Sequence, residues 1–423
     1  MSWAWFTSNF LYLLEMVVQE QYAPQLREEE RINELNLLAY NERNHDPKSS
    51  FTYATEAKEA SEKVNYKKGK ADALNNLGFY YFQATELEKS LEILLEALAL
   101  HEGIGNEKGV ADSHYNMATL QIRFANFNLA TEELNKCITI REKFQDKPGL
   151  ANCYFQLTYI HDMFDHANEA LEIAEKGLAI RREMNDRIGM AALYNLMGRI
   201  YIKKKEFDKA RGFLDTALNL RVPEDEIRGY FATIFTKVEL EIACGRLKEA
   251  KTLAEEGLSM SSKGVDWFGI MRFKLVSGKV AMVSGDVDNA KNLFIEALRV
   301  SEERSFKSIQ YEVCQQLSEL FEGQGDHKEA LAYYKKFHTL KEEVLSNQSG
   351  ARLKSIQLMS QIESSKKEAE LERVKNVDLK NAFQVIEEKN KEILDSIKYA
   401  SRIQRALITQ EVYVEKSLKN LNP

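Results

Sequence analysis

Apolar residues recur along most of the chain with the three- and four-residue spacing of α-helices, and the pattern itself repeats. Leu74, Leu77 and Tyr81 would share one face of a helix, and a second such face follows a short polar turn. In the second helices alanine stands at positions 130, 170, 210, 250, 290 and 330, a constant step of 40 residues. About eight such units cover residues 31–350.

Small residues within each unit indicate how its two helices pack. Gly78 and Gly198 lie in first helices, and an alanine opens most second helices, so two helix backbones can approach closely. Neither helix can bury its apolar face alone, and neighbouring pairs therefore have to stack. The sequence predicts an all-α fold, a right-handed α-solenoid of about eight helical hairpins followed by a long coiled-coil helix. Such a solenoid has a concave inner surface.

This pattern resembles the tetratricopeptide repeat, whose Leu-Gly-x-x-Tyr and Ala-x-x-x-Phe spacings it shares in a longer, 40-residue unit. The resemblance implies that certain positions of each first helix line the groove, where asparagine amides can donate to and accept from an extended peptide backbone. Arg199 is the one basic residue among them, which disfavours the family's carboxylate clamp. A groove closed by the chain's own helices is the alternative. The expected partner-binding residues are Asn75, Phe79, Tyr115, Asn116, Thr119, Asn152, Phe155, Gln156, Tyr159, Asn195 and Arg199.

After about Gly350 the 40-residue step stops, and residues 351–423 read as a charged helix with a heptad seam. A lone Asn390 at an a position is typical of a parallel, two-stranded coiled coil, so we expect a homodimer. Apolar residues at Leu394, Ile403 and Ile408 leave open that this helix packs on another domain or folds back on the repeats. The expected dimerisation residues are Leu379, Phe383, Ile386, Asn390, Ile393, Ile397, Ala400, Gln404 and Leu407.

Residues 392–408 resemble the linker helix that precedes PPM-type serine/threonine phosphatase domains in bacterial signalling proteins, which are similar to regulators of sigma factors. The resemblance implies a sensory, dimerising half that regulates a phosphatase-type output domain. The proline that usually follows the linker is absent, with Thr409 in that region. The sequence ends at Pro423, where the catalytic domain would begin, so no phosphatase residue is carried over.

Composition excludes several classes of protein. The net charge of −7 disfavours nucleic acid as a partner. Four cysteines without a Cys-x-x-Cys pair indicate reduced, buried thiols and a cytoplasmic location. The apolar N-terminus carries Glu15 and lacks the basic region and cleavage site of a secretory signal, so we expect a capping helix over 1–30. No other stretch is apolar enough to cross a membrane.

The sequence carries no motif that predicts catalysis or a cofactor. The densest group of metal-ligand types is His161, Asp165 and His166, but histidines five apart do not share a helix face. The glycines between Gly103 and Gly109 follow a predicted helix and not a strand, so they form a turn between units and no phosphate loop.

The sequence therefore predicts a non-catalytic scaffold or sensor module that binds a protein or linear peptide and regulates an output domain through its coiled coil. It predicts no enzyme activity, no cofactor and no metal. The alternatives are a stand-alone peptide receptor and an assembly scaffold.

Overall fold

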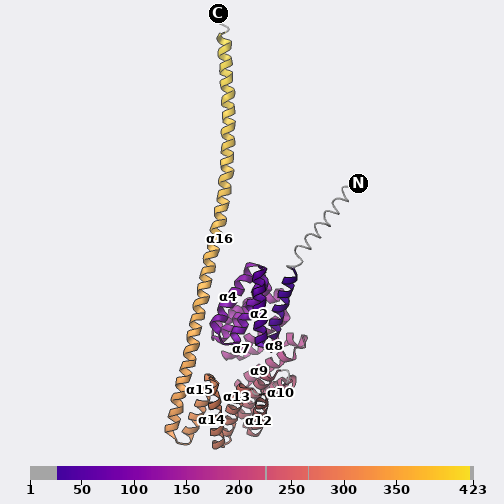
Figure 1. The fold of residues 1–423 in the computed structure, drawn as a ribbon, viewed down its shortest axis with the longest axis vertical. Helices are drawn as coiled ribbons and strands as arrows, with labels where there is room; N and C mark the ends of the chain where they lie inside the picture. The colour runs from indigo at the N-terminus through magenta and orange to yellow at the C-terminus, as the bar shows by residue number, and fades with distance from the viewer. Residues whose placement is uncertain (1–25, 224–225, 265, 420–423) are drawn as a thin grey trace, which may run out of the picture. The chain divides into compact units, whose positions relative to one another are not determined.

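The computed structural model describes residues 26–223, 226–264 and 266–419, apart from the side chains of residues 366 and 406–412. Every regular element in those ranges is an α-helix, which confirms the predicted all-α solenoid. Successive helices lie next to one another along the chain (Figure 1). A helix over 26–42 is followed by α2 (Pro47–Lys63), α3 (Lys67–Gln83), α4 (Leu87–Gly103), α5 (Glu107–Arg123), α6 (Phe127–Lys143), α7 (Lys147–Met163), α8 (Ala167–Glu183), α9 (Arg187–Lys203), α10 (Phe207–Leu220), α11 (Ile227–Ala243), α12 (Leu247–Lys263), α13 (Trp267–Val283), α14 (Val287–Glu303), α15 (Lys307–Gly323) and α16 (His327–Lys419).

Most helices from α2 to α15 are 17 residues long and end in the same three-residue turn. After α4, Gly105 takes φ 68°. Its N–H donates to the Glu102 carbonyl at 3.1 Å, and the Asn106 N–H donates to the His101 carbonyl at 2.9 Å. This double hydrogen bond is a Schellman motif, which satisfies carbonyls at the helix end. Residues with positive φ recur every twentieth position through most of the chain, so the turn geometry fixes the period.

Close contact between the two helices of a hairpin explains the small residues of the repeat. A Cβ atom added at Gly78 would lie 2.5 Å from Leu94 Cδ2, and one at Gly278 would lie 2.4 Å from Phe294 Cε1. Leu94 and Phe294 are both fully buried. Each glycine thus leaves room for a large side chain of the second helix.

Replacing Gly278 by alanine is expected to destabilise the fold by about 1–3 kcal/mol, because the added methyl group forces the buried Phe294 ring to move. Gly212, in α10, has no atom within 4 Å of an added Cβ, and there the same substitution should stabilise the fold by about 0.5–1 kcal/mol. Urea unfolding followed by circular dichroism measures both. Equal effects at the two positions would contradict the packing argument.

One connection departs from the repeat. Helix α10 is 14 residues long, and Arg221 after it is extended, with φ −95° and ψ 139°. Pro223 lies two residues further on, and its missing N–H and fixed ring disfavour further helix. The sequence analysis did not single out this position.

The described residues fall into two units, divided between Ser355 and Ile356, and α16 runs through both. The first part of α16 completes the last hairpin, where Ala330 joins the core formed with α13, α14 and α15. Only the end of the predicted capping helix over 1–30 lies within the described residues. No helix in the described ranges combines the length and apolar character needed to cross a membrane.

Residues of α16 up to and including Ser355 contact the second and third hairpins, more than 220 positions earlier in the sequence. The Ser355 hydroxyl donates to Gln121 Oε1 at 3.2 Å and accepts from Asn126 Nδ2 at 2.7 Å, and Arg352 Nε donates to Asn126 Oδ1 at 2.8 Å. Lys354 forms an ion pair with Glu88. Gln121, Asn126 and Ser355 are at most 3 % exposed. We call this buried polar contact the α16 clip.

Candidate functional site

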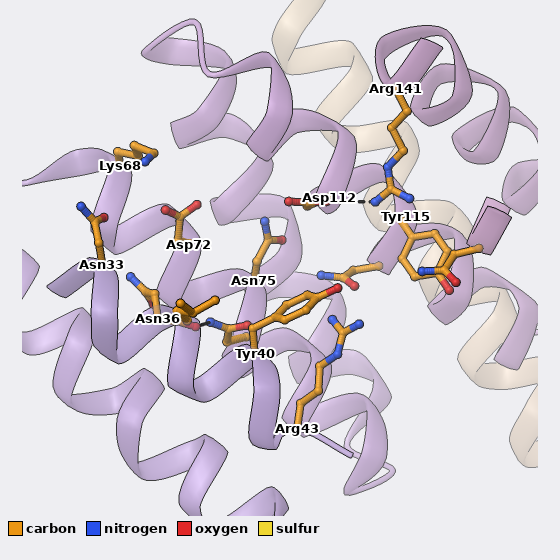
Figure 2. A pocket seen from close by; sticks show the side chains of 14 residues that line it. Asn33, Asn36, Tyr40, Arg43, Lys68, Asp72, Asn75, Asp112, Tyr115 and Arg141 are labelled. Carbon is orange, nitrogen blue, oxygen red and sulfur yellow. Dashed lines mark hydrogen bonds and ion pairs between the residues drawn. The ribbon is translucent and has the colours of Figure 1, made fainter. Parts of the chain in front are cut away.

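The candidate site is a cavity of about 450 Å³ on the first hairpins of the solenoid (Figure 2). Most of its wall comes from the first helix of each successive unit, so side chains 40 residues apart meet there, and Arg141 of α6 completes it. The wall is rich in amides, carries two aromatic residues and has charges of both signs. Its lining residues are Asn33, Asn36, Leu37, Tyr40, Arg43, Lys68, Asp72, Asn75, Asn76, Asp112, Tyr115, Asn116, Arg141 and Asn152.

A buried row of basic side chains borders this wall from the second helices. His101, Arg141, Arg181 and Arg221 follow one another at the 40-residue step, and each is at most 8 % exposed. The first three each face a polar residue of the preceding first helix. His101 Nε2 lies 3.6 Å from Asp72 Oδ1. Arg141 Nη2 donates to Asp112 Oδ1 at 2.9 Å, and Arg181 Nη2 donates to Asn152 Oδ1 at 3.0 Å. We call these four side chains the basic ladder.

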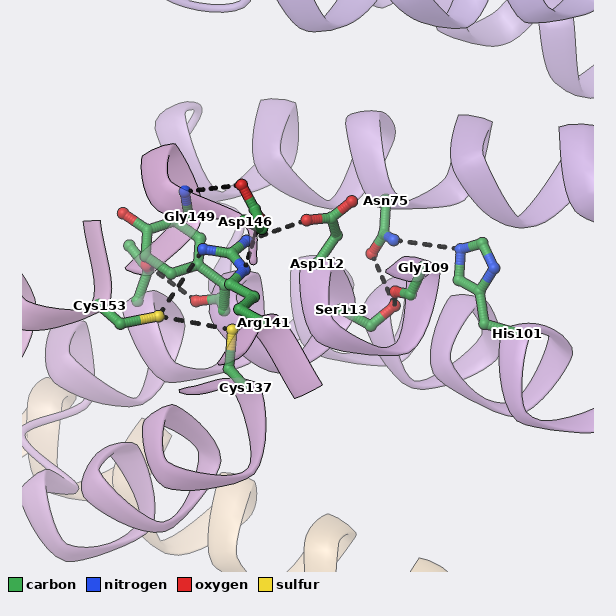
Figure 3. Close-up of polar contacts among 12 residues, drawn as sticks. Asn75, His101, Gly109, Asp112, Ser113, Cys137, Arg141, Asp146, Gly149 and Cys153 are labelled. Carbon is green, nitrogen blue, oxygen red and sulfur yellow. Dashed lines mark hydrogen bonds and ion pairs between the residues drawn. The ribbon is translucent and has the colours of Figure 1, made fainter. Parts of the chain in front are cut away.

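The basic ladder also fixes the turns that follow it. Arg141 Nε lies 3.5 Å from Asp146 Oδ2, and Asp146 in turn caps α7 by accepting from the Gly149 N–H at 3.1 Å (Figure 3). Arg181 and Arg221 form the equivalent ion pairs with Asp186 and Glu226. Each of these arginines therefore links the groove wall to the turn that leads into the next helix. Buried hydrogen bonds of this kind fix the distance between wall residues of neighbouring units.

The asparagines of the wall differ in how much of their amide is already used. Asn75 Oδ1 accepts from the Ser113 hydroxyl at 3.1 Å, and its Nδ2 lies 3.3 Å from His101 Nε2. The Asn76 amide donates to the Asn36 carbonyl at 3.0 Å. For Asn116, the described part of the chain records no side-chain hydrogen bond, so its amide is the one best placed to bind a ligand.

Two carboxylates, those of Asp72 and Asp112, lie in the wall of the cavity. Burial raises the pKa of Asp72, whose side chain is 30 % exposed, to about 6, an effect that Lys68 opposes and Asp112 increases. The Asp112 side chain is 58 % exposed and pairs with the Arg141 guanidinium. Burial lowers the pKa of His101 to about 4, so this imidazole is neutral near pH 7. The cavity therefore gains negative charge as the pH rises through about 6.

Asp72→Asn is expected to stabilise the protein at pH 8 and to have a smaller effect at pH 4.5, near the start of the titration. Because the fold favours the protonated carboxyl group, the stability linked to it is full below the unfolded pKa near 3.8 and is lost as the pH rises through 6. Asparagine cannot ionise, so the variant should gain about 1–2 kcal/mol at pH 8, discounted for the partial exposure of the side chain. Calorimetric Tm values at both pH values test this, with exposed Asp378→Asn as the control. A gain that is equal at both pH values would contradict it.

The structure brings four of the predicted partner-binding residues into the cavity wall, namely Asn75, Tyr115, Asn116 and Asn152. The others lie outside it. Phe155 and Tyr159 pack partly between hairpins, and Thr119 donates to its own helix at the Tyr115 carbonyl. The Arg199 guanidinium pairs with Asp162, with Nε 2.8 Å from Oδ2. Phe79 lies beside Phe82, Gln156 lies outside the cavity lining, and Asn195 Oδ1 is buried without a hydrogen-bond partner among the described residues.

The predicted dimerisation residues from Leu379 to Gln404 are all exposed on α16. Leu379, Phe383, Ile386, Ile393 and Ile397 each expose more than half of their surface. The side chain of Leu407 lies outside the described residues. The role of this face stays a prediction.

Sequence reasoning missed several wall residues whose signals were present. Asn36 precedes Asn76 and Asn116 at the 40-residue step, so extending the groove positions back by one unit would have found it. The basic ladder recurs at the same step but lies on second helices, which the resemblance did not assign to the groove. Within the described ranges, no group of three His, Cys, Asp or Glu side chains could hold a metal ion.

Comparison with known proteins agrees with this architecture. Residues 69–143 match a family model described as a tetratricopeptide repeat, and residues 191–221 and 311–343 match a second model of the same description. The matched segments are tetratricopeptide repeats. Together they span less than half of the chain. No curated protein matches the sequence.

Several solved structures share the fold. The apo form of the quorum sensor NprR from B. thuringiensis superposes with a TM-score of 0.62 at 19 % identity, covering 79 % of this chain and 96 % of that one. A Rap protein complexed with competence and sporulation factor gives 0.55 at 14 % identity, covering 76 % and 99 %. The Rap conjugation gene regulator of plasmid pLS20, in complex with the Phr* peptide, gives 0.54 at 16 %, covering 75 % and 96 %. These similarities establish a common solenoid fold.

Proposed function

We propose that this protein is a non-catalytic sensor that binds a linear peptide in the groove of its hairpins and dimerises through α16. The observation that carries the proposal is the cavity of about 450 Å³, which has the size of a ligand site and a wall of amide, aromatic and charged side chains. An amide such as that of Asn116 can donate to and accept from the backbone of an extended segment.

Structures with the same fold support a peptide as the ligand. A Rap protein has been crystallised with competence and sporulation factor, the plasmid pLS20 regulator has been solved with the Phr* peptide, and NprR has been crystallised with its cognate peptide NprX. Sequence identities of 14–18 % support a shared fold only. The case for peptide binding by this chain therefore rests on the side chains of its own cavity wall.

The α16 clip supports a connection between the groove and the long helix. It joins α16 to the end of α5 and the start of α6, and α5 also carries Asp112, Tyr115 and Asn116 of the cavity wall. A ligand that shifts α5 therefore moves a helix that α16 is hydrogen-bonded to. The buried polar groups would lose their partners if the clip opened, so opening it costs free energy.

Ser355→Ala is expected to weaken the clip by about 1–3 kcal/mol, because Gln121 and Asn126 each lose a buried partner. Hydrogen–deuterium exchange of residues 340–355 should become faster, while exchange in α5 stays slow. Ser346→Ala, an exposed serine earlier on α16, is the matched control and should leave exchange unchanged. Unchanged exchange in Ser355→Ala would show that the clip does not hold α16.

The heptad seam of α16 supports a parallel homodimer, and the resemblance of residues 392–408 to phosphatase linker helices supports regulation of an output domain. A stand-alone peptide receptor fits the groove equally well and needs no output domain. An assembly scaffold would instead bind folded proteins and show no affinity for short peptides.

Selection from a random peptide library on the immobilised protein tests the proposal. We expect enriched peptides that bind with a stoichiometry of one per chain in calorimetry and protect α3 and α5 from hydrogen exchange. Enrichment of no peptide, or protection elsewhere, would reject the groove as the binding site.

A further inference from the structure

Two cysteines on consecutive helices meet behind the groove wall. Cys137 on α6 and Cys153 on α7 have their Sγ atoms 3.5 Å apart, and both side chains are fully buried (Figure 3). Both are reduced in this structure. The contact joins the second helix of one unit to the first helix of the next.

The repeat itself enforces this contact. The equivalent positions of later units are Gly177 with Leu193 and Gly257 with Phe273. A Cβ added at Gly177 would lie 3.2 Å from Leu193 Cδ1, and one at Gly257 would lie 2.1 Å from Phe273 Cε1. The positions therefore touch whichever residues occupy them, so the two sulfurs are held together by the packing of α6 on α7.

A cation lies beside one of the two sulfurs. Arg141 Nη1 is 3.7 Å from Cys153 Sγ, while Nη2 of the same guanidinium donates to Asp112. The hydrogen bond with Cys137 and the charge of Arg141 lower the pKa of Cys153, whereas burial and the same hydrogen bond raise the pKa of Cys137. The pair is thus asymmetric, with Cys153 the more nucleophilic thiol.

Small molecules can approach Arg141 from two sides. The groove cavity of about 450 Å³ and a second cavity of about 420 Å³ are both lined by Arg141 and Asp112. The second cavity is also lined by residues of the turn between α6 and α7, among them Phe144 and Asp146. Cys153 lines neither of these two cavities and is fully buried, so a peroxide reaches its sulfur only when the packing around Arg141 opens.

We propose that Cys137 and Cys153 form a dithiol site that hydrogen peroxide oxidises to an intrachain disulfide. The Cys153 thiolate attacks one peroxide oxygen, the O–O bond breaks, and the leaving hydroxide takes up the proton released from the thiol to give water. Cys137 Sγ then attacks the Cys153 sulfenic acid, the S–O bond breaks, and the second water leaves with the Cys137 proton. Two thiols are oxidised and one peroxide is reduced.

Formation of the disulfide changes the groove through Arg141. The sulfurs move from 3.5 Å to about 2.05 Å apart, which draws α6 towards α7. The ionisable sulfur 3.7 Å from the guanidinium disappears, so Asp112, which already lies 2.9 Å from Arg141, is left as its counter-charge in the groove wall. The consequence for peptide binding rests on the proposed function, whereas the oxidation itself does not.

Peptide mapping of the full chain after peroxide treatment, unfolding and alkylation tests the site. We expect a single disulfide linking the peptides of Cys137 and Cys153, a mass loss of two hydrogens and reversal by dithiothreitol, with Cys314 still alkylated. In Cys137→Ala, dimedone should trap a sulfenic acid at Cys153, and Cys153→Ala should leave Cys137 unmodified. Oxidation of the partly exposed Cys244 shows that the peroxide treatment was effective. If Cys137 and Cys153 can both still be alkylated after that treatment, the proposal is wrong.

Variants of Arg141 separate its charge from its packing. Arg141→Gln is expected to slow disulfide formation about tenfold, because the thiolate loses its cation, and Arg141→Lys should restore most of the rate. Equal rates in both variants would overturn the role of the guanidinium. A measured disulfide with unchanged affinity for a library-selected peptide would reject only the coupling to the groove. If the untreated, reduced protein binds no library peptide, that result rejects the proposed function and leaves the proposed oxidation untouched.

Discussion

Asn116→Ala is expected to lower the affinity for a library-selected peptide by about 30- to 100-fold without changing the fold. The amide can make two hydrogen bonds to an extended backbone, and losing both costs about 2–3 kcal/mol when the ligand groups are left unpaired. The folded protein itself should be little affected, because the described structure records no hydrogen bond that uses this side chain. Fluorescence anisotropy with a labelled peptide measures the loss, and circular dichroism checks the fold.

Thr119→Ala is the matched control, one helical turn further along α5. Its hydroxyl bonds to the Tyr115 carbonyl of its own helix at 3.0 Å, and the residue lies outside the cavity wall. We expect its peptide affinity to stay within about twofold of the wild type, as for a surface change away from the ligand. If Asn116→Ala kept full peptide affinity while Thr119→Ala lost it, the peptide would bind outside the cavity.

The hairpins were predictable because the forces that form them are local. Gly78 faces Leu94 across one hairpin, and a chain that repeats this pair of positions every 40 residues repeats the contact as well. The residue with positive φ that follows most helices is likewise determined locally, by the hydrogen bonds of the turn itself. A sequence with such regular spacing therefore specifies element order and hairpin packing directly.

The groove was predictable only in part, because helix position does not tell which amides are already bonded. Asn75 occupies a groove position as predicted, yet His101 and Ser113 take up its amide. His101 lies on a second helix, and its partnership with Asn75 depends on how one unit stacks on the next. The basic ladder would have needed a search of second helices for recurring polar residues.

The α16 clip and the cysteine pair depend on contacts that no local pattern encodes. Gln121 occupies the position that Tyr81, Tyr201 and Phe321 hold in other units, a departure visible in the sequence. The structure explains this departure, because the hydroxyl of Ser355, 234 positions later, donates a hydrogen bond to the Gln121 side chain. Cys137 and Cys153 likewise carry no motif, and they meet because α6 packs on α7.

Ile386→Asp is expected to convert a homodimer into a monomer, raising the dissociation constant at least about 100-fold. Ile386 is a d position of the proposed seam and is 54 % exposed on the single helix. A two-stranded coil would bury both copies, each worth about 1.5–3 kcal/mol, and the variant replaces them with two facing carboxylates. Sedimentation equilibrium should show the mass falling from twice to once the chain mass of 48.7 kDa.

Val385→Asp makes an equivalent change on the neighbouring residue, which lies off the seam at a c position and is 57 % exposed. Since both variants add one carboxylate to an exposed β-branched site, only the heptad position distinguishes them, and Val385→Asp should remain dimeric. Dissociation in both variants would indicate a broad apolar interface and not a two-stranded seam. A wild-type chain that sediments as a monomer would reject the dimer and favour the stand-alone receptor, because α16 would then have no second copy through which to transmit a change in the groove.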